Sequence, residues 1–350
     1  MQDMGHKEKF FVTGRIAVLD QLRAIAVICV LISHFSIAIN SKFIAIQNNS
    51  INIGLIGVLI FFCVSGYVIP WSMNTRDGLT SIFGFWIRRV FRLYPIYIVM
   101  SILGWFFLSD NWYVSKIYSE MMSGPIVYWG GALSMMSHFL GQNTVFQGLE
   151  WTLAYEMLFY LACTVFLLLR RWLANVISLF VLVLTVSFIS IGFDLYDANS
   201  NIQKILYFYL FFLSGLTCFL FKRNVLSHRF FTLLSFVLIA TMFCRVLIWY
   251  KYWGVSYLTF SFIPAIFIFY SFILERIIVS SKLMPLIGVV SYSIYLMHIF
   301  VPHSIPLTDF PPVIRFLVWT IITVAIASIS YKLIELPAIK MSRRIVYKKY

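Results

Sequence analysis

Residues 19–35 read LDQLRAIAVICVLISHF, and this stretch decides the class of fold. Beyond Arg23 the chain stays predominantly apolar as far as Ser41, and His34 is the ionisable side chain within that run. A helix needs about 20 apolar residues to cross the hydrocarbon core of a bilayer. The stretch therefore predicts a transmembrane helix over residues 24–41.

The rest of the chain has the same character. Of its 350 residues, 61% are hydrophobic and 11% are charged, whereas soluble domains carry roughly a quarter charged residues. Aromatic residues, at 19%, suit lipid-facing helices and membrane interfaces. We predict an all-α, polytopic transmembrane bundle of about ten spans. The predicted spans are residues 24–41, 51–71, 93–109, 151–169, 173–193, 205–221, 230–250, 255–274, 284–303 and 313–334.

The basic residues predict the topology. A net charge of +14 is typical of nucleic-acid-binding proteins, but here the Lys and Arg residues lie in interhelical loops rather than on one soluble face. With the N-terminus inside, the inner segments hold 20 Lys and Arg residues and the outer stretches hold five. Cytoplasmic loops are enriched in Lys and Arg. Both termini are therefore predicted to be cytoplasmic, and no nucleic-acid partner is expected.

One apolar stretch, residues 125–140, does not fit as a crossing. It is short, contains a Gly pair, and lies in the predicted outer loop 110–150. We interpret it as a re-entrant or interfacial helix, because an eleventh crossing would move every later loop to the opposite side of the membrane and remove the charge bias. We expect one membrane domain over residues 1–350 with no appended soluble domain. The five cysteines have no metal or redox spacing, so we expect no metal site.

Ionisable residues in apolar helices are costly and therefore mark candidate sites. Arg23 and His34 are eleven residues apart, which puts them on one helix face about 16 Å apart along the axis. Asp20 lies one turn from Arg23. Imidazole is suited to proton transfer near neutral pH. The alternative is a structural histidine that hydrogen-bonds a neighbouring helix.

Three further stretches carry polar groups. FGFWIRRVFRLYP (83–95) contains three arginines, which either anchor the inner end of a span or bind phosphate groups. LEWTLAYEMLFYL (149–161) places Glu156 and Tyr160 four residues apart on one face. VVSYSIYLMHIF (289–300) has a polar stripe of Ser291, Tyr295 and His298, which interhelical hydrogen bonds alone would also explain.

The second span, GVLIFFCVSGYVIP (57–70), has small residues that predict close helix packing. These small residues are Gly57, Ser65 and Gly66. Arg245 and Glu335 are weaker candidates for a site, each a charged residue close to or within a predicted span.

Together these stretches resemble the membrane acyltransferase-3 family of bacterial O-acyltransferases, which modify surface polysaccharides, O-antigens and nodulation factors. The resemblance rests on several pieces in the same order over residues 15–337. They are the arginine and histidine of the first span, GVLIFFCVSGYVIP, the arginine-rich segment before Tyr-Pro, WTLAYEMLFYL, SYSIYLMH and the final IELP. Two positions depart from the family pattern. Gln21 replaces a Gly, and Thr152 replaces a Ser.

The resemblance implies a membrane O-acyltransferase of the bacterial inner membrane that moves an acyl group, most often acetyl, from cytosolic acyl-CoA to a hydroxyl of a surface glycan or its lipid-linked precursor. His34 is then a general base or forms an acyl-histidine. Arg23 helps to hold the donor, and Asp20 or Glu156 orients the imidazole or balances its charge. Arg88, Arg89 and Arg92 are the predicted sites for the CoA phosphates. Tyr295, His298 and Trp151 are the predicted substrate-binding residues. The outer loop 110–150 with Trp112, Tyr113 and Trp129 is expected to frame the glycan, and the alternative is that these aromatic residues lie at the membrane interface.

The competing class is a secondary transporter or flippase for a lipid-linked sugar. Buried Arg, His and Glu residues also form proton relays in such proteins. Transporters favour internal repeats with paired broken helices, and the sequence has no convincing repeat.

Overall fold

Helices make up most of the part of the protein that the structure describes. The computed structural model describes residues 11–12, 15–39, 51–72, 79–107, 112–146, 149–173, 176–196, 201–253, 257–277, 279 and 281–347. A hairpin of two-residue strands, β1 (Phe11–Val12) and β2 (Arg15–Ile16), precedes the first helix. The predicted all-α class is confirmed.

Five helices among the described residues are long and apolar enough to cross a membrane. They occupy Ala17–Ser36, Ile53–Trp71, Ile202–Lys222, His228–Trp249 and Pro312–Val346. These stretches overlap the first, second, sixth, seventh and tenth predicted spans, although the first begins seven residues earlier than predicted and the last continues twelve residues further. The total of about ten crossings and the cytoplasmic placement of both termini stay predictions.

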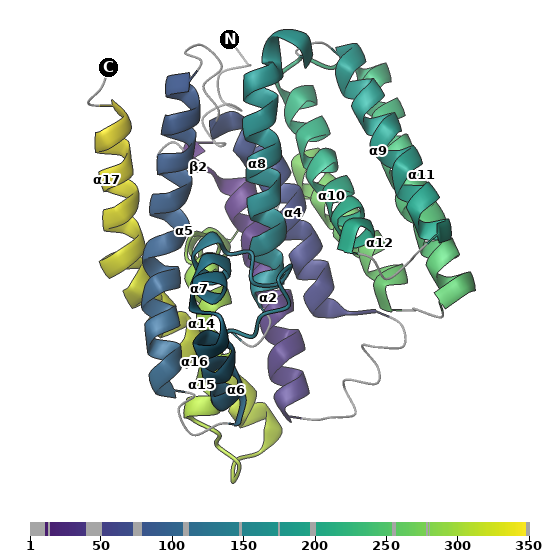
Figure 1. The fold of residues 1–350 in the computed structure, drawn as a ribbon. Helices are drawn as coiled ribbons and strands as arrows, with labels where there is room; N and C mark the ends of the chain where they lie inside the picture. Colours follow the sequence, from purple (N-terminus) through teal and green to yellow (C-terminus); the bar gives the residue numbers. More distant parts are fainter. Residues whose placement is uncertain are drawn as a thin grey trace. The chain divides into compact units, whose positions relative to one another are not determined.

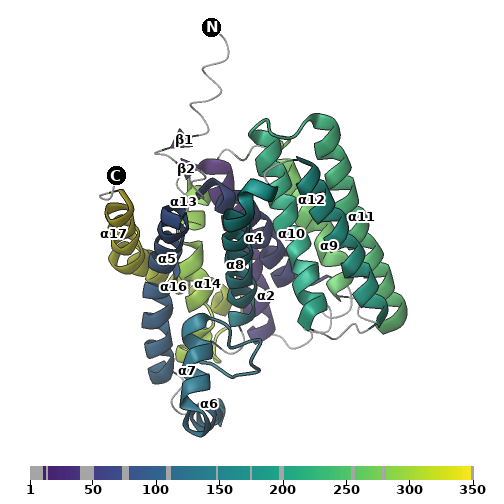
Figure 2. The same cartoon turned by 45° about the horizontal axis from the view of Figure 1, so that its top comes forward.

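The chain folds into two compact units, of which the first comprises residues 1–71 and 174–292. Its four helices α9 to α12 stand side by side, as both views show (Figures 1 and 2). The helices of this unit are α2 (Ala17–Ile39), α4 (Ile53–Ser72), α9 (Val176–Tyr196), α10 (Asn201–Lys222), α11 (His228–Trp253), α12 (Tyr257–Ile273) and α13 (Leu283–Val289).

Glycines allow backbones in this unit to approach closely. A Cβ atom on Gly66 of α4 would overlap the carbonyl oxygen of Phe212 in α10, and one on Gly57 would overlap that of Ala26 in α2. The predicted packing role is confirmed for Gly57 and Gly66. Gly288 of α13 lies in the same way against the Asp20 carbonyl group of α2, so α2 is held tightly at the end that carries Asp20.

The second unit comprises residues 72–173 and 293–350. The last helix, α17, lies alongside α5 in both views (Figures 1 and 2). The helices are α5 (Leu79–Phe107), α6 (Trp112–Ser123), α7 (Pro125–Ser134), α8 (Glu150–Leu173), α14 (Ser291–Met297, whose first two residues belong to the first unit), α15 (Phe300–Ser304), α16 (Pro312–Ser330), the π-helical turn η1 (Tyr331–Glu335) and α17 (Leu336–Tyr347).

Two predicted spans differ from the helices observed. The third was expected to begin at residue 93, but α5 begins at Leu79 because the arginine-rich segment continues the helix. At 29 residues it is about 44 Å long, which exceeds the roughly 30 Å of a hydrocarbon core. The ninth, residues 284–303, is divided into three short helices, α13, α14 and α15. At the second break, His298 Nδ1 bonds the Tyr295 carbonyl oxygen at 2.7 Å, so a side chain competes with the helix ladder there.

The predicted short helix in the outer loop is present as α7. Its ten residues extend about 15 Å, half of a hydrocarbon core, so this helix cannot cross a bilayer by itself. It ends at Met135, which adopts a left-handed backbone conformation, and turns follow as far as Gly141.

Candidate active site

The first unit contributes the histidine of α2. The side chain of His34 is exposed, whereas its neighbours Ser33 and Phe35 are buried. One turn of the helix therefore has an imidazole accessible to a ligand between two side chains that pack into the protein. This exposure is what a catalytic base requires, since it must reach the proton that it removes.

Asp20 and Arg23 form an ion pair on the same helix. Arg23 Nη1 lies 3.1 Å from Asp20 Oδ1. The pair is largely buried, with side-chain exposures of 17% for Arg23 and 9% for Asp20. Gln21 between them donates a hydrogen bond to the Val279 carbonyl oxygen at 2.8 Å, which ties this turn to the segment before α13. The predicted adjacency of Asp20 and Arg23 is confirmed.

In the second unit, Glu156 of α8 and Arg89 of α5 both interact with Tyr160. Tyr160 donates a hydrogen bond to Glu156 Oε1 at 2.5 Å, which confirms that the two side chains share a helix face. The Arg89 guanidinium lies 5.5 Å from the centre of the Tyr160 ring and 5.6 Å from that of Phe85. Arg89 is buried, so its charge is stabilised in part by the faces of two aromatic rings.

The structure separates Arg89 from the other two arginines predicted to bind phosphate. Arg88 and Arg92 are partly exposed and stand one helical turn apart on α5. Arg88 also passes close to Gly84, since a Cβ atom there would lie 3.2 Å from Arg88 Nη1. Two of the three guanidinium groups are therefore accessible to an anionic ligand in this conformation.

The predicted substrate-binding residues of α14 and its C-terminal turn are buried. The Tyr295 hydroxyl lies 2.9 Å from Thr152 Oγ1 and donates to the Leu149 carbonyl oxygen at 3.3 Å, so it joins α14 to the start of α8. His298 is fully buried. Trp151 is partly exposed and lies edge-to-face with Tyr155, their ring centres 5.9 Å apart. Of these three residues, Trp151 is the accessible one.

The two weaker candidates are also buried. In the first unit, Arg245 donates to Ser190 Oγ and to the Gln203 carbonyl oxygen, and its guanidinium lies 5.1 Å from the Trp249 ring centre. In the second unit, Glu335 accepts a hydrogen bond from Ser293 and closes the π-helical turn η1. Both therefore connect helices within their units.

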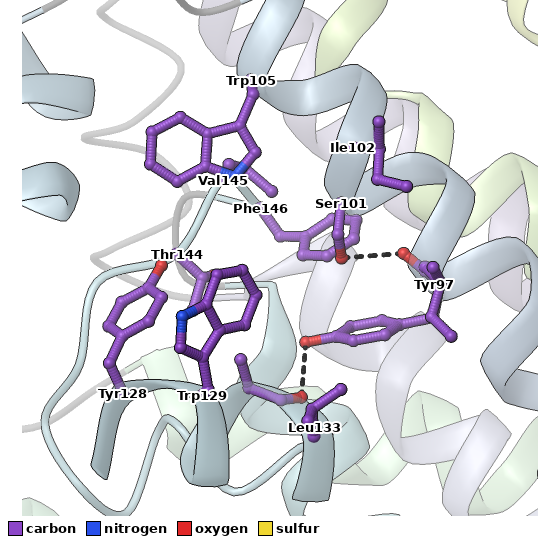
Figure 3. A pocket seen from close by; sticks show the side chains of 12 residues that line it. Tyr97, Ser101, Ile102, Trp105, Tyr128, Trp129, Leu133, Thr144, Val145 and Phe146 are labelled. Atoms are coloured by element: carbon purple, nitrogen blue, oxygen red, sulfur yellow. Dashed lines mark hydrogen bonds between the residues drawn. The ribbon is translucent and has the colours of Figure 1, made fainter. Parts of the chain in front are cut away.

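A pocket of about 500 Å³ lies between α5, α7 and residues 144–146 of the second unit (Figure 3). Tyr97 and Tyr94 of α5 donate hydrogen bonds to the carbonyl oxygens of Ala132 and Leu133 at 3.2 and 2.7 Å, which hold α7 against α5. The pocket is lined by Tyr97, Ile98, Ser101, Ile102, Trp105, Tyr128, Trp129, Ala132, Leu133, Thr144, Val145 and Phe146.

Sequence reasoning identified Trp129 but missed most of this pocket. Tyr97, Ser101 and Trp105 are spaced four residues apart on one face of α5, a pattern visible in the sequence. This pattern does not include Thr144, which joins the pocket lining from the loop before α8. The side chains of Trp112 and Tyr113, the other predicted glycan-framing residues, lie outside the described part of the structure.

Within the described residues, no group of three or more His, Cys, Asp or Glu side chains is arranged to hold a metal ion. The candidate residues that the structure describes supply an imidazole, an ion pair, a hydrogen-bonded carboxylate and guanidinium groups. Such a set suits proton transfer and the binding of anions.

Comparison with known proteins shows what this chain is similar to. A family model described as "Acyltransferase domain" matches residues 16–332. The chain is 28% identical over 159 residues to the acyltransferase MdmB of Streptomyces mycarofaciens, covering 42% of this chain and 38% of that protein. It is 32% identical over 180 residues to YrhL of Bacillus subtilis (strain 168), named as a candidate peptidoglycan O-acetyltransferase, covering 47% of this chain and 26% of that one.

A third relative is similar along almost the whole chain. The O-acetyltransferase OatA of Staphylococcus aureus (strain NCTC 8325 / PS 47) is 26% identical over 398 residues, covering 96% of this chain and 59% of that protein. The chain thus spans less than two thirds of the length of each of these relatives. No solved structure matches it. Because the family model covers nearly all of the sequence, the chain belongs to the acyltransferase-3 family that its motifs resemble.

Proposed function

We propose that this protein is a membrane O-acyltransferase that moves an acyl group, most simply acetyl, from acyl-CoA to a hydroxyl of a cell-surface glycan or its lipid-linked precursor. Family membership and the names of MdmB, YrhL and OatA support the acyl-transfer class. The observation that carries the proposal is the exposed His34 on the helix that also holds the Asp20–Arg23 ion pair.

In the proposed reaction His34 acts as the general base. It accepts the proton of the acceptor hydroxyl while that oxygen attacks the thioester carbonyl carbon. The tetrahedral intermediate collapses as its C–S bond breaks, and the imidazolium returns the proton to the departing CoA sulfur. The products are the glycan ester and free CoA. The rival route, in which His34 itself attacks and becomes acylated before the glycan attacks, uses the same residue.

The arginines of α5 give the donor two candidate contacts. Arg88 and Arg92 are partly exposed and one turn apart, and guanidinium groups bind phosphate oxygens in bidentate geometry. Arg23, already paired with Asp20, helps to hold the donor in this proposal, and Asp20 balances its charge. Glu156 is the second acidic candidate for orienting the imidazole.

The substrates and the location follow from the same interpretation. Trp151 is the accessible candidate for substrate binding, and Tyr295 and His298 support it from within the protein. The protein lies in the bacterial inner (cytoplasmic) membrane, with the lipid bilayer as its surroundings. The donor comes from the cytosol, and no metal or nucleic acid takes part.

Replacing His34 tests the proposal directly. Membranes containing the His34→Ala protein are incubated with labelled acetyl-CoA, and the glycan fraction is examined for label and by mass spectrometry. We expect transfer to fall by about 10²–10⁴-fold, the usual contribution of a general base. His303→Ala, which changes another exposed histidine, is the matched control and should keep wild-type transfer.

Two results would reject the assignment. If His34→Ala protein of normal abundance acetylates the glycan at the wild-type rate, then His34 is not the catalytic base. If the wild-type protein incorporates no label but moves a lipid-linked sugar across vesicle membranes, then the transporter class is correct and the acyltransferase proposal fails.

A further inference from the structure

Two helical stretches of the second unit are longer than a bilayer core and carry only basic charges at one end. α5 is about 44 Å long, and the stretch Pro312–Val346, which contains α17, extends about 52 Å. Both exceed the roughly 30 Å of a hydrocarbon core. Neither α5 nor α17 contains an Asp or Glu residue, whereas together they hold six Lys and Arg residues. A single sign of charge of this kind attracts anions.

The charged ends of α5 and α17 lie against each other. A Cβ atom on Gly84 would lie 3.2 Å from Arg88 Nη1 and 3.4 Å from Val346 Cγ1, so both atoms lie beside the same point of α5. The end of α17 lies beside the start of α5 in both views, so the two helices run antiparallel (Figures 1 and 2). Four residues along α5 from Gly84 and four back along α17 from Val346 therefore place Arg88 level with Ser342.

Helical geometry selects one of the three cations of α17. Arg343 precedes Val346 by about one turn and lies about 60° from it around the helix axis. Lys340 and Arg344 lie about 120° and 160° from Val346, further from the face that contacts α5. Arg343 is therefore the cation on the side of α17 that is next to Arg88, and it is nearly level with it.

The cations of α17 have no acidic partner in the part of the chain that the structure describes. Lys340, Arg343 and Arg344 are exposed, and none of them forms an ion pair with another described residue. Guanidinium groups repel each other when they come close. A phosphate group removes that repulsion, because it carries negative charge and accepts several N–H groups at once. Arginines that converge from two helices thus suit a ligand that carries phosphate.

The two flanks of α17 distinguish a water-borne ligand from a lipid head group. Met341 and Ile345 are exposed apolar side chains on one flank of the buried Ser342, and Arg343 is on the other flank. An exposed apolar flank of a helix at a membrane surface faces the lipid. Arg343 is therefore turned away from the lipid, toward the side that a soluble phosphate compound reaches.

We infer that Arg343 of α17 joins Arg88 of α5 in binding a phosphate group of the acyl-CoA donor. The inference rests on the proposed function and adds to it a donor-binding residue that the sequence motifs did not indicate. CoA carries a diphosphate group and a 3′-phosphate group, so it offers several anionic oxygens to a cluster of guanidinium groups. The last helix then contributes to donor recognition as well as packing on α5.

The test is CoA binding by the purified full-length protein, measured by titration calorimetry in a neutral detergent. Arg343→Gln should weaken CoA binding about tenfold or more, because charged hydrogen bonds to phosphate are lost. Arg344→Gln is the matched control, since it removes the same charge from a different face of the same helix. It should bind CoA within about twofold of the wild type, because an exposed charge without direct contact contributes little. Both variants should unfold at the wild-type temperature, since both side chains are exposed.

Three results would overturn the inference. They are equal weakening in both variants, which would indicate a general effect of positive charge, wild-type binding by Arg343→Gln, and a wild-type protein that binds no CoA. Native mass spectrometry tests the lipid alternative. Loss of bound phosphatidylglycerol from Arg343→Gln with unchanged CoA binding would show that this residue binds a lipid head group instead. Arg343-dependent CoA binding by a protein that transfers no acyl group would support the site and reject the proposed function.

Discussion

At the residue scale, burial distinguishes side chains that the sequence places together. Arg88, Arg89 and Arg92 belong to one cationic segment, yet Arg89 is buried against Tyr160 and Phe85 while the other two are accessible. Tyr160 in turn donates to Glu156. Arg89 is therefore better placed to orient Tyr160 and Glu156 than to bind a phosphate group, although its predicted donor-binding role stays open to test.

This difference predicts a split in kinetic constants. The double variant Arg88→Gln/Arg92→Gln should raise KM for acetyl-CoA by about tenfold or more, because charged hydrogen bonds to phosphate are lost. Its kcat should change less. Arg89→Lys and Tyr160→Phe should instead lower kcat and leave KM nearly unchanged, because they disturb Glu156. Steady-state kinetics with varied acetyl-CoA measures both constants.

Arg276→Gln, an exposed arginine of the segment after α12, is the control for a general loss of positive charge. Equal rises in KM for Arg89→Lys and for the double variant would show that all three arginines bind the donor. An unchanged KM in the double variant would remove the phosphate site from this segment.

At the scale of elements, close helix contacts define the first unit. Gly66 of α4 and Gly215 of α10 each lie where a Cβ atom would overlap the backbone of the other helix. Small residues allow such approaches between membrane helices, where packing replaces the hydrophobic effect as the main force. The second span was predicted to pack in this way from its small residues, but its partner helix was not predictable.

Gly66→Ala should therefore destabilise the protein strongly. The added methyl group meets the Phe212 carbonyl group, which is backbone and cannot rotate away, so α4 and α10 must separate. Overpacking of this kind costs about 1–3 kcal/mol or more. Thermal unfolding of the purified protein in detergent measures the loss.

Gly192→Ala on α9 is the matched control, since a Cβ atom there has no neighbour within 4 Å. Alanine favours a helix over glycine by about 1 kcal/mol, so this variant should be as stable as the wild type or slightly more stable. Equal unfolding temperatures for Gly66→Ala and the wild type would contradict the close contact between α4 and α10.

At the scale of the whole molecule, the distribution of charge predicts the topology. The segment 110–150 contains two helices, α6 and α7, of 12 and 10 residues, and neither is long enough to cross a bilayer. The arrangement agrees with an outer loop and an unchanged orientation for every later span. The assignment of each loop to the inner or outer side of the membrane remains a prediction that an experiment can test.

Reporter fusions give that test. Alkaline phosphatase fused after Gly124 should be active, because we expect residue 124 outside, and the same enzyme fused after Asn224 should be inactive. A fluorescent protein fused after Tyr350 should fluoresce in the cytoplasm. An active phosphatase at Asn224 would mean that residues 125–140 cross the membrane and reverse the later loops.

The sequence by itself determined the membrane class, the order of the helices and the family. Apolar run length and local motif spacing are properties of neighbouring residues, so they can be read without knowing the fold. For the same reason the Asp20–Arg23 and Glu156–Tyr160 pairs, each within one or two helical turns, were predictable and are confirmed.

Only the tertiary structure decided which side chains are accessible. It exposes His34 between buried Ser33 and Phe35, buries Arg89 beside accessible Arg88, and brings Thr144 to the pocket that Tyr97 lines. Helical periodicity assigns residues to faces, but the face that becomes covered depends on contacts between segments far apart in the chain. Those contacts form only when many distant segments pack together, so a local pattern in the sequence does not predict them.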